Sequence, residues 1–314
     1  MITFAVKIGH IMLQEEITFQ ALTNNEDIHV GYSDSDIVIV DSIQKFAEIS
    51  AAHITMSAIA ICLSGKVQGL MNGQPITLRK NQVAVIPPNV NITELMISPD
   101  FDIKAMFFTN GILQSFLREK MNVWNDMMYI HRLHVITLEE DENLLFFKQF
   151  YDMLSFCMDR QDENPFSTDI IQSLLRAVVL GLCGNMKLLL PDRGTVLSSQ
   201  RKNRPSSSAN THFQRFLDLL HTEHSKHRTV ESYANELCIS PKYLSAICKR
   251  NSGKSANEWI TEHVMEDIRY YLKQTDYSIK QICNLLGFPN PSFFGKYVKE
   301  HFGITPTQLR NNSQ

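Results

Sequence analysis

Two segments of the C-terminal region carry basic and small polar residues on what would be the outward face of a helix. These residues are Lys242, Ser245, Ala246, Lys249 and the neighbouring Arg250 in the first segment, and Asn290, Ser292, Gly295, Lys296 and Lys299 in the second. In the major groove, asparagine pairs with adenine edges, lysine pairs with guanine, and alanine contacts a thymine methyl group, whereas serine is ambiguous. Lysine and arginine also contact phosphates, which position a protein without specifying a sequence. The pattern predicts contact with nucleic acid, and a solvated surface charge is the alternative for each single lysine.

The charge distribution points the same way. The net charge of −3 combines 13 basic and 22 acidic residues in 1–190 with 17 basic and 11 acidic residues in 191–314. An acidic N-terminal part and a basic C-terminal part indicate that the C-terminal part binds a polyanion. The basic excess is modest, so the sequence pattern has to decide.

The two segments belong to an internal repeat with an offset of 49–50 residues. Each copy begins with a hydroxyl residue that can cap a helix, Thr229 or Ser278, and closes on a glycine, Gly253 or Gly303, where a helix end favours positive φ. A short helix, a three-residue break and a second helix lie between them. We expect the second helices to turn these residues inward: Tyr243, Leu244, Ile247 and Cys248, and Phe293, Phe294, Tyr297 and Val298. This is the pattern of a helix-turn-helix unit, present twice.

A continuous apolar stripe from Trp259 to Leu272 predicts one long connecting helix over 257–275. At ~1.5 Å per residue such a helix is about 28 Å long. Successive major-groove segments on one face of B-DNA lie ~34 Å apart. Two recognition helices joined in this way can therefore enter adjacent major grooves.

Residues 212–310 resemble the C-terminal DNA-binding domain of the AraC/XylS family of bacterial transcription regulators. In the second copy, Ile279-x-x-Ile282-Cys283-x-x-Leu286-Gly287-Phe288 is similar to the family's I-x-x-I-A-x-x-x-G-F, and the run from Ser292 to Lys299 is similar to S-Y-F-S-R-x-F-K. The stretch Gly303-Ile304-Thr305-Pro306 followed by Arg310 is similar to G-x-T-P-x-x-Y-R. The resemblance implies base contacts near Lys242, Ser245, Ala246, Asn290, Ser292 and Lys296. Lys249, Arg250 and Lys299 are better placed for phosphates.

The first half of the chain predicts a sheet-rich domain. Short apolar segments recur at roughly 8–12-residue spacing, and Asn72-Gly73 is a strong type I′ hairpin signal. The expected strands cover 36–40, 54–63, 67–71, 75–78, 83–86, 92–97 and 103–108, which predicts a sandwich or barrel. This rhythm resembles the cupin-like sensor domain of many AraC/XylS regulators. The cupin metal block G-(x5)-H-x-H-(x3,4)-E is missing after Gly65, so we expect no metal and no cofactor.

Two apolar helices are predicted next, over 144–157 and 170–189. The apolar arc of the second is wide for one small sheet to cover, so part of it is interpreted as a subunit interface, with core packing as the equal alternative. No apolar run approaches the ~18–20 residues that span a bilayer. We see no secretory signal and no C-x-x-C pair, and expect a cytoplasmic protein.

The expected fold class is α+β. Residues 1–190 form a cupin-like β-barrel with a helical dimerisation segment, and residues 211–314 form an all-α DNA-binding domain with two helix-turn-helix motifs. Residues 191–210, rich in serine, proline and basic residues, predict a linker between them.

Two other kinds of chemistry were weighed. His221, His224 and His227 have spacings that could hold zinc, but the third lies about 240° round a helix from the first, which favours a solvated helix end. The motifs of a nucleophile elbow, a phosphate-binding loop and a zinc protease are not found in the sequence. A cupin-type enzyme, metal-dependent or metal-independent, with a DNA-binding tail is one alternative function. A regulator without ligand whose N-terminal domain docks a protein is another.

We therefore expect a sequence-specific regulator of transcription that binds double-stranded promoter DNA, and not an enzyme. A small-molecule effector, homodimerisation and contact with RNA polymerase are the other expected interactions. The family resemblance favours activation over repression.

Overall fold

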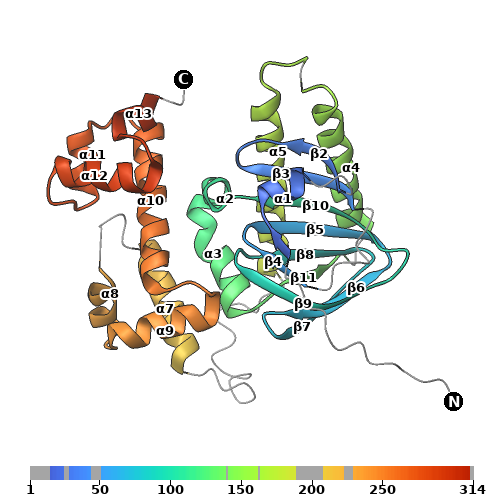
Figure 1. Cartoon of the computed structure of the whole chain (residues 1–314), viewed down its shortest axis with the longest axis horizontal. Coiled ribbons are helices and arrows are strands. Elements are labelled where there is room, and N and C mark those ends of the chain that lie inside the picture. The colour runs from blue at the N-terminus through green and yellow to red at the C-terminus, as the bar shows by residue number, and fades with distance from the viewer. Residues whose placement is uncertain are drawn as a thin grey trace. The chain divides into compact units, whose positions relative to one another are not determined.

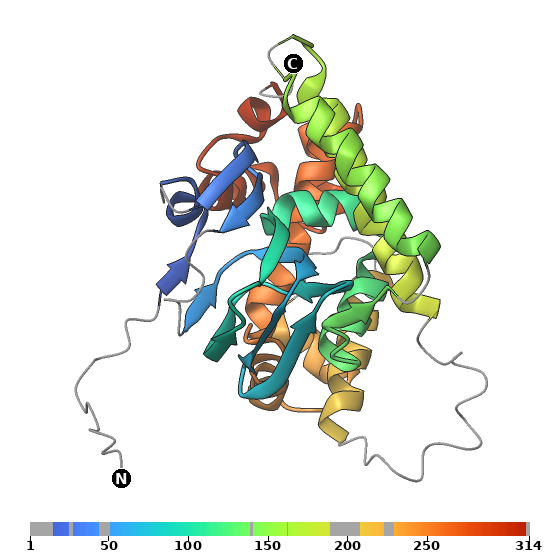
Figure 2. The ribbon, with the colours of Figure 1, turned by 90° about the vertical axis from the view of Figure 1, so that its right-hand side faces the viewer.

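The computed structural model describes residues 15–24, 28–43, 51–138, 141–161, 163–188, 208–222 and 229–311. The chain divides into two compact units (Figures 1 and 2). Unit 1 comprises Met1–Phe116 and Leu133–Met186, and unit 2 comprises Leu117–Arg132 and Lys187–Gln314. The segment Leu117–Arg132 therefore groups with the C-terminal helices, although it lies in the middle of the expected N-terminal domain.

Unit 1 is built on two β-sheets. Among the described residues, a five-stranded sheet has the order β1-β4-β9-β6-β7 and a six-stranded sheet has the order β11-β8-β5-β10-β3-β2. Neighbouring strands are antiparallel except for β1 and β4. The strands are β1 (Glu15–Ile17), β2 (Ile28–Ser33), β3 (Ile37–Ile43), β4 (Ala52–Ile54), β5 (Ser57–Ser64), β6 (Lys66–Met71), β7 (Gln74–Arg79), β8 (Gln82–Ile86), β9 (Val90–Ile97), β10 (Asp102–Phe108) and β11 (Val135–Thr137).

The predicted hairpin joins β6 and β7. Met71 pairs with Gln74, and the two residues between them, Asn72 and Gly73, have φ values of 48° and 76°. Both values are positive, as a type I′ turn requires. The Asn72 side-chain oxygen also accepts a hydrogen bond from the Asn91 backbone N–H at 2.9 Å, which ties the turn to β9.

The β-rich N-terminal part and the helical C-terminal part confirm the α+β class. The two sheets do not join into one closed barrel within the described residues, so of the two expected forms the arrangement is nearer a sandwich. Its apolar core includes a row of small residues on neighbouring strands, Ala84, Ala60 and Ala105.

The helices of unit 1 within the described residues are α1 (Phe19–Thr23), α2 (Asn110–Leu117, whose last residue counts with unit 2), α4 (Asp141–Met158) and α5 (Ser167–Leu188, whose last two residues count with unit 2). Contrary to the sequence expectation, α5 is long and apolar enough to cross a membrane by length and composition alone. One face of α5, from Ile171 to Met186, is buried in the protein.

Unit 2 is helical. Its elements are η2 (Arg118–Lys120), α3 (Met121–Asn125), η3 (Asp126–Ile130), α7 (Ser208–Thr222), α8 (Val230–Glu236), α9 (Pro241–Ser252), α10 (Ala256–Gln274), α11 (Ile279–Leu285), α12 (Pro291–Phe302) and α13 (Pro306–Asn311). The predicted connecting helix is α10. Most of the predicted linker lies outside the described residues, but its last three positions, 208–210, form the first turn of α7.

Candidate DNA-binding interface

The first helix-turn-helix unit consists of α8 and α9. The Thr229 hydroxyl caps α8 by accepting from the Ser232 N–H at 3.3 Å, and the Ser240 hydroxyl caps α9 by accepting from the Tyr243 N–H at 3.2 Å. The turn between them passes through Cys238, whose φ is 57°. Gly253 ends α9 in the left-handed conformation with φ of 76°. These local signals set the limits of both helices.

The second unit, α11 and α12, repeats this design. Ser278 and Gln281 form a capping box at the start of α11, and Gly287 in the turn has φ of 70°. The Asn290 side-chain oxygen caps α12 by accepting from the Phe293 N–H at 2.8 Å. Gly303 ends α12 with φ of 74°. The predicted caps and glycine ends of both copies are thereby confirmed.

The recognition helices α9 and α12 each have a buried face and an exposed face. Leu244, Ile247 and Cys248 of α9 are buried, as are Phe294 and Val298 of α12. The nine predicted contact residues are exposed, except for the half-buried Ser245. The remaining eight are Lys242, Ala246, Lys249, Arg250, Asn290, Ser292, Lys296 and Lys299. The structure thus groups them on the solvent-facing sides of two short helices in one unit.

Two inward assignments were wrong. Tyr243 is 38% exposed and Phe293 is 47% exposed, although both were expected to face the core. Each lies one residue before the core position of its helix, Leu244 or Phe294, and one residue is a rotation of about 100°. The Tyr243 ring lies 6.1 Å from the His212 ring and the Phe293 ring lies 6.2 Å from the Phe288 ring, measured between ring centroids. Both aromatic rings therefore border the polar faces of the recognition helices, which residue type alone did not reveal.

The basic residues at the C-terminal ends of these helices can stabilise the helix dipole and can contact phosphates. Lys249 and Arg250 lie in the last turn of α9, and Lys299 lies in the last turn of α12. A cation at this place stabilises the negative end of the helix dipole by about 0.3–1 kcal/mol. Because all three are exposed, they also remain able to reach phosphate oxygens.

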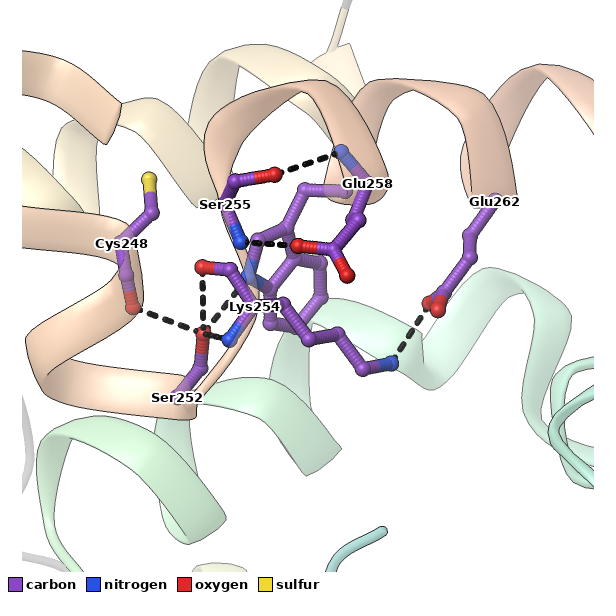
Figure 3. Close-up of polar contacts among 7 residues, drawn as sticks. Cys248, Ser252, Lys254, Ser255, Glu258 and Glu262 are labelled. Atoms are coloured by element: carbon purple, nitrogen blue, oxygen red, sulfur yellow. Dashed lines mark hydrogen bonds and ion pairs between the residues drawn. The ribbon is translucent and has the colours of Figure 1, made fainter. Parts of the chain in front are cut away.

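Polar contacts fix the start of α10 against α9 (Figure 3). The Ser252 hydroxyl accepts from the Trp259 indole N–H at 2.8 Å and donates to the Cys248 carbonyl at 2.9 Å. A capping box opens α10, in which the Ser255 hydroxyl accepts from the Glu258 N–H and the Glu258 carboxylate accepts from the Ser255 N–H. The hydrogen bond from Ser255 holds the pKa of Glu258 below its usual range.

A buried ion pair lies beside this junction. The Lys254 Nζ lies 2.6 Å from the Glu262 carboxylate, and the Lys254 side chain is only 5% exposed. At the other end of α10, the Arg310 guanidinium donates to the Leu272 carbonyl at 3.2 Å and to the Tyr277 carbonyl at 2.6 Å. The start of the connecting helix is thereby tied to α9, and its end is tied to α13, which follows the second helix-turn-helix unit.

The possible zinc ligands remain untested by the structure. His224 and His227 lie outside the described residues. In the part of the chain that is described, no group of three or more His, Cys, Asp or Glu side chains could hold a metal ion.

Residues 233–312 match the family described as "Helix-turn-helix domain". The chain is 23% identical over 222 residues to the uncharacterized HTH-type transcriptional regulator YtdP of Bacillus subtilis, covering 67% of this chain and 25% of that protein. It is 30% identical over 103 residues to the lactose operon transcription activator of Staphylococcus xylosus, covering 33% of this chain and 37% of that protein. The chain therefore spans only about a quarter to two fifths of the length of these relatives.

A solved structure, the C-terminal domain of the response regulator AraT from Geobacillus stearothermophilus, is 28% identical. The likeness covers 34% of this chain and 90% of that chain, with a TM-score of 0.32. The matched domain lies in the part of the chain that holds the doubled helix-turn-helix geometry, and the relatives named here are a transcriptional regulator and a transcription activator.

Proposed function

We propose that this chain regulates transcription by binding promoter DNA sequence-specifically through α9 and α12. The observation that carries the proposal is the matched pair of recognition helices. Both begin with a capping residue and a proline, both end at a left-handed glycine, and both expose polar residues on one side. The connecting helix α10 has 19 residues and is about 28 Å long. Both recognition helices are therefore suited to adjacent major grooves, which lie ~34 Å apart.

Direct readout is assigned to the residues near the starts of the two helices. Base contacts are proposed for Lys242, Ser245, Ala246, Asn290, Ser292 and Lys296, and phosphate contacts for Lys249, Arg250 and Lys299. Asn290 already uses its side-chain oxygen in the α12 cap, which limits how its amide turns towards a base. The first helix is poor in hydrogen-bond donors, so DNA shape and apolar contact contribute more of its specificity.

For unit 1 the proposed role is a cupin-like sensor of a small-molecule effector that also forms a homodimer. We assign these roles to residues 1–190, with 191–210 as linker and 211–314 as DNA-binding domain. Dimerisation through the helices within 141–190 is supported by Met153 and Phe156 of α4, each 55% exposed, and by the partly exposed Ile170 and Leu180 of α5. Effector binding would change the spacing of half-sites or the contact with RNA polymerase. The similarity to a lactose operon transcription activator supports activation.

The test is a selection of bound duplexes from a random pool with the full chain at a stated salt concentration. The expected product is a motif with two blocks about one helical turn apart, and a repeated motif if the chain dimerises. Lys273→Ala is a matched control, since Lys273 is an exposed lysine of α10 outside α9 and α12. It should select the same motif as the unaltered chain. Binding that is only salt-sensitive, with no motif recovered, would contradict sequence-specific regulation.

A further inference from the structure

The segment Leu117–Arg132 lies between two parts of unit 1 in the sequence but packs with the helices of unit 2. It contains η2, α3 and η3, of which α3 packs against α7 and η3 packs against both α7 and α9. Most of its large side chains are buried, among them Trp124, Met127, Met128 and Tyr129. A segment that lies between two parts of unit 1 in the sequence thus contributes to the core of unit 2.

Three contacts hold this segment to α7 and α10. The Tyr129 ring meets the Trp259 ring edge to face, with centroids 5.3 Å apart and planes at 86°. The Asp126 carboxylate accepts a hydrogen bond from the Gln214 amide at 3.1 Å. The Arg118 guanidinium lies over the Tyr270 ring at 2.8 Å. Aromatic, hydrogen-bonding and cation–π contacts therefore act together over the whole length of the segment.

The backbone of the segment is irregular where it carries Tyr129. Residues Asp126–Ile130 form one π-helical turn, in which the His131 N–H donates to the Asp126 carbonyl at 2.9 Å. The wider turn buries three successive side chains, 127–129, which a regular α-helix would spread around its axis. Arg132 then takes a left-handed φ of 52° as the chain leaves for unit 1. Such conformations persist only where the surroundings hold them in place.

Trp259 is contacted from the segment, from α7 and from the end of α9. Its ring is bordered by Tyr129, by Phe213 of α7 at 6.2 Å and by the Lys254 ammonium at 5.2 Å, and its N–H is bonded to Ser252 at the end of α9. The same Lys254 is paired with Glu262 (Figure 3). Tyr129 therefore contacts Trp259, which is hydrogen-bonded to the end of α9.

The segment does not cover the polar face of the first recognition helix. Lys242, Ala246 and Lys249 stay exposed while Tyr129 is seated on Trp259. The contact thus stabilises the first helix-turn-helix unit from its buried side and leaves its polar recognition face accessible.

We infer that Leu117–Arg132 is an intramolecular docking segment that links the state of unit 1 to DNA binding by the first helix-turn-helix unit, an inference that rests on the proposed function. The segment is continuous with unit 1 at both ends, Phe116 and Leu133. A change in unit 1 that pulls on either end favours release of Tyr129 from Trp259 and withdraws the support from α7, α9 and the start of α10. By linkage, DNA that requires the seated segment must also stabilise its seating.

The two tryptophans of the chain provide the test, because Trp124 lies within the segment and Trp259 beneath it. In full-length protein carrying Trp124→Phe, Trp259 is the sole tryptophan. Tyr129→Ala in this background should expose Trp259 to acrylamide quenching and weaken binding to the selected duplex by roughly tenfold, within the usual range of coupling between sites. In a footprint of the selected duplex, the DNA block read by the first unit should lose its protection from cleavage, and the other block should keep it. Tyr129→Phe, which keeps the ring, is the matched control and should behave like the parent.

A second measurement needs no substitution. Amide exchange in the full-length chain should slow at residues 117–132 when the selected duplex is added. Three results would each overturn the inference. The first is that Tyr129→Ala leaves the quenching of Trp259 unchanged, and the second is that quenching increases while both DNA blocks stay protected. The third is that the exchange of amides 117–132 does not change when the duplex is added. Failure of the parent chain to bind any duplex specifically would instead overturn the proposed function, while the quenching comparison would still report whether the segment is seated.

Discussion

Cys238 and Gly287 occupy the same place in the two helix-turn-helix units, and both have a left-handed backbone, with φ values of 57° and 70°. Each lies two residues after the last residue of the first helix, and each precedes the cap of the recognition helix by two or three residues. A glycine adopts this conformation without steric cost, whereas a cysteine does not. The first unit therefore carries strain that the second unit avoids.

Cys238→Gly should stabilise unit 2. Relief of the left-handed strain, about 1–2 kcal/mol, exceeds the roughly 0.5–1 kcal/mol of extra chain entropy that glycine brings, so a net gain of about 0.5–1 kcal/mol is expected. Urea unfolding followed by tryptophan fluorescence measures it, because Trp124 and Trp259 both lie in unit 2. Cys238→Ala, which removes the exposed thiol but keeps the strain, should leave the unfolding free energy nearly unchanged. A glycine variant no more stable than the alanine variant would contradict this account of the turn.

Lys296 and Lys299 should differ in what their loss does to DNA binding. Lys296→Ala should cost about 1–3 kcal/mol and relax preference at one base position. Lys299→Ala should weaken binding to all duplexes alike and lower the slope of log K against log salt by about 1. Affinities measured over a salt series with the selected duplex and its single-base variants separate the two roles. A uniform loss of affinity for Lys296→Ala would instead place Lys296 at a phosphate.

Glu262→Gln should destabilise unit 2, since it leaves the Lys254 ammonium buried without its counter-charge. Loss of one partner of a buried pair costs about 3–5 kcal/mol. The Glu262 side chain is 27% exposed, so we expect about 2–3 kcal/mol here. Chemical unfolding is the measurement, with Glu258→Gln as control because the exposed Glu258 forms the capping box of α10 and is not the ion-pair partner of Lys254. An effect no larger than that of the control would show that the ion pair contributes little.

Stability should depend on pH through Glu266. Burial raises the pKa of Glu266 to about 7, although Arg269, 2.9 Å away, and Arg118 oppose the rise. The ordinary value is 4.5. Between these values the folded chain keeps a proton that the unfolded chain has released, so the contribution of Glu266 falls as pH rises from 4.5 to about 7.

Replacing Glu266 by glutamine tests this sign. Glu266→Gln should flatten the fall in stability over that pH window, which amounts to at most about 3 kcal/mol. Unfolding free energies at a series of pH values give the slope for both proteins. If the slopes agree, Glu266 is ionised in the folded chain across the window, and Arg269 rather than burial controls it.

The sequence predicted what local signals encode. Hydroxyl caps at Thr229 and Ser278, glycine ends and the apolar stripe of α10 located both helix-turn-helix units, and Asn72-Gly73 located the hairpin of the first sheet. Each of these features depends on a few neighbouring residues.

Features that depend on distant residues or on small rotations were missed. Cysteine has no preference for positive φ, so the strained turn at Cys238 left no signal. Tyr243 and Phe293 were placed in the core because aromatic residues usually are, and a single step along the helix was enough to expose them. Residues 117–132 pack with helices that begin only after residue 207. This packing depends on contacts such as that of Tyr129 with Trp259, which the periodicity of the sequence does not reveal.

The most direct test of the central claim, that α9 and α12 read one DNA face together, is to change the distance between the two blocks of the selected duplex. An insertion of about 5 bp, half a helical turn, places one block on the opposite face of the DNA. The connecting helix α10 is tied at both ends and cannot follow this rotation. We expect affinity to fall to that of a duplex with a single block. Equal affinity for the original and the lengthened duplex would contradict joint binding by the two units.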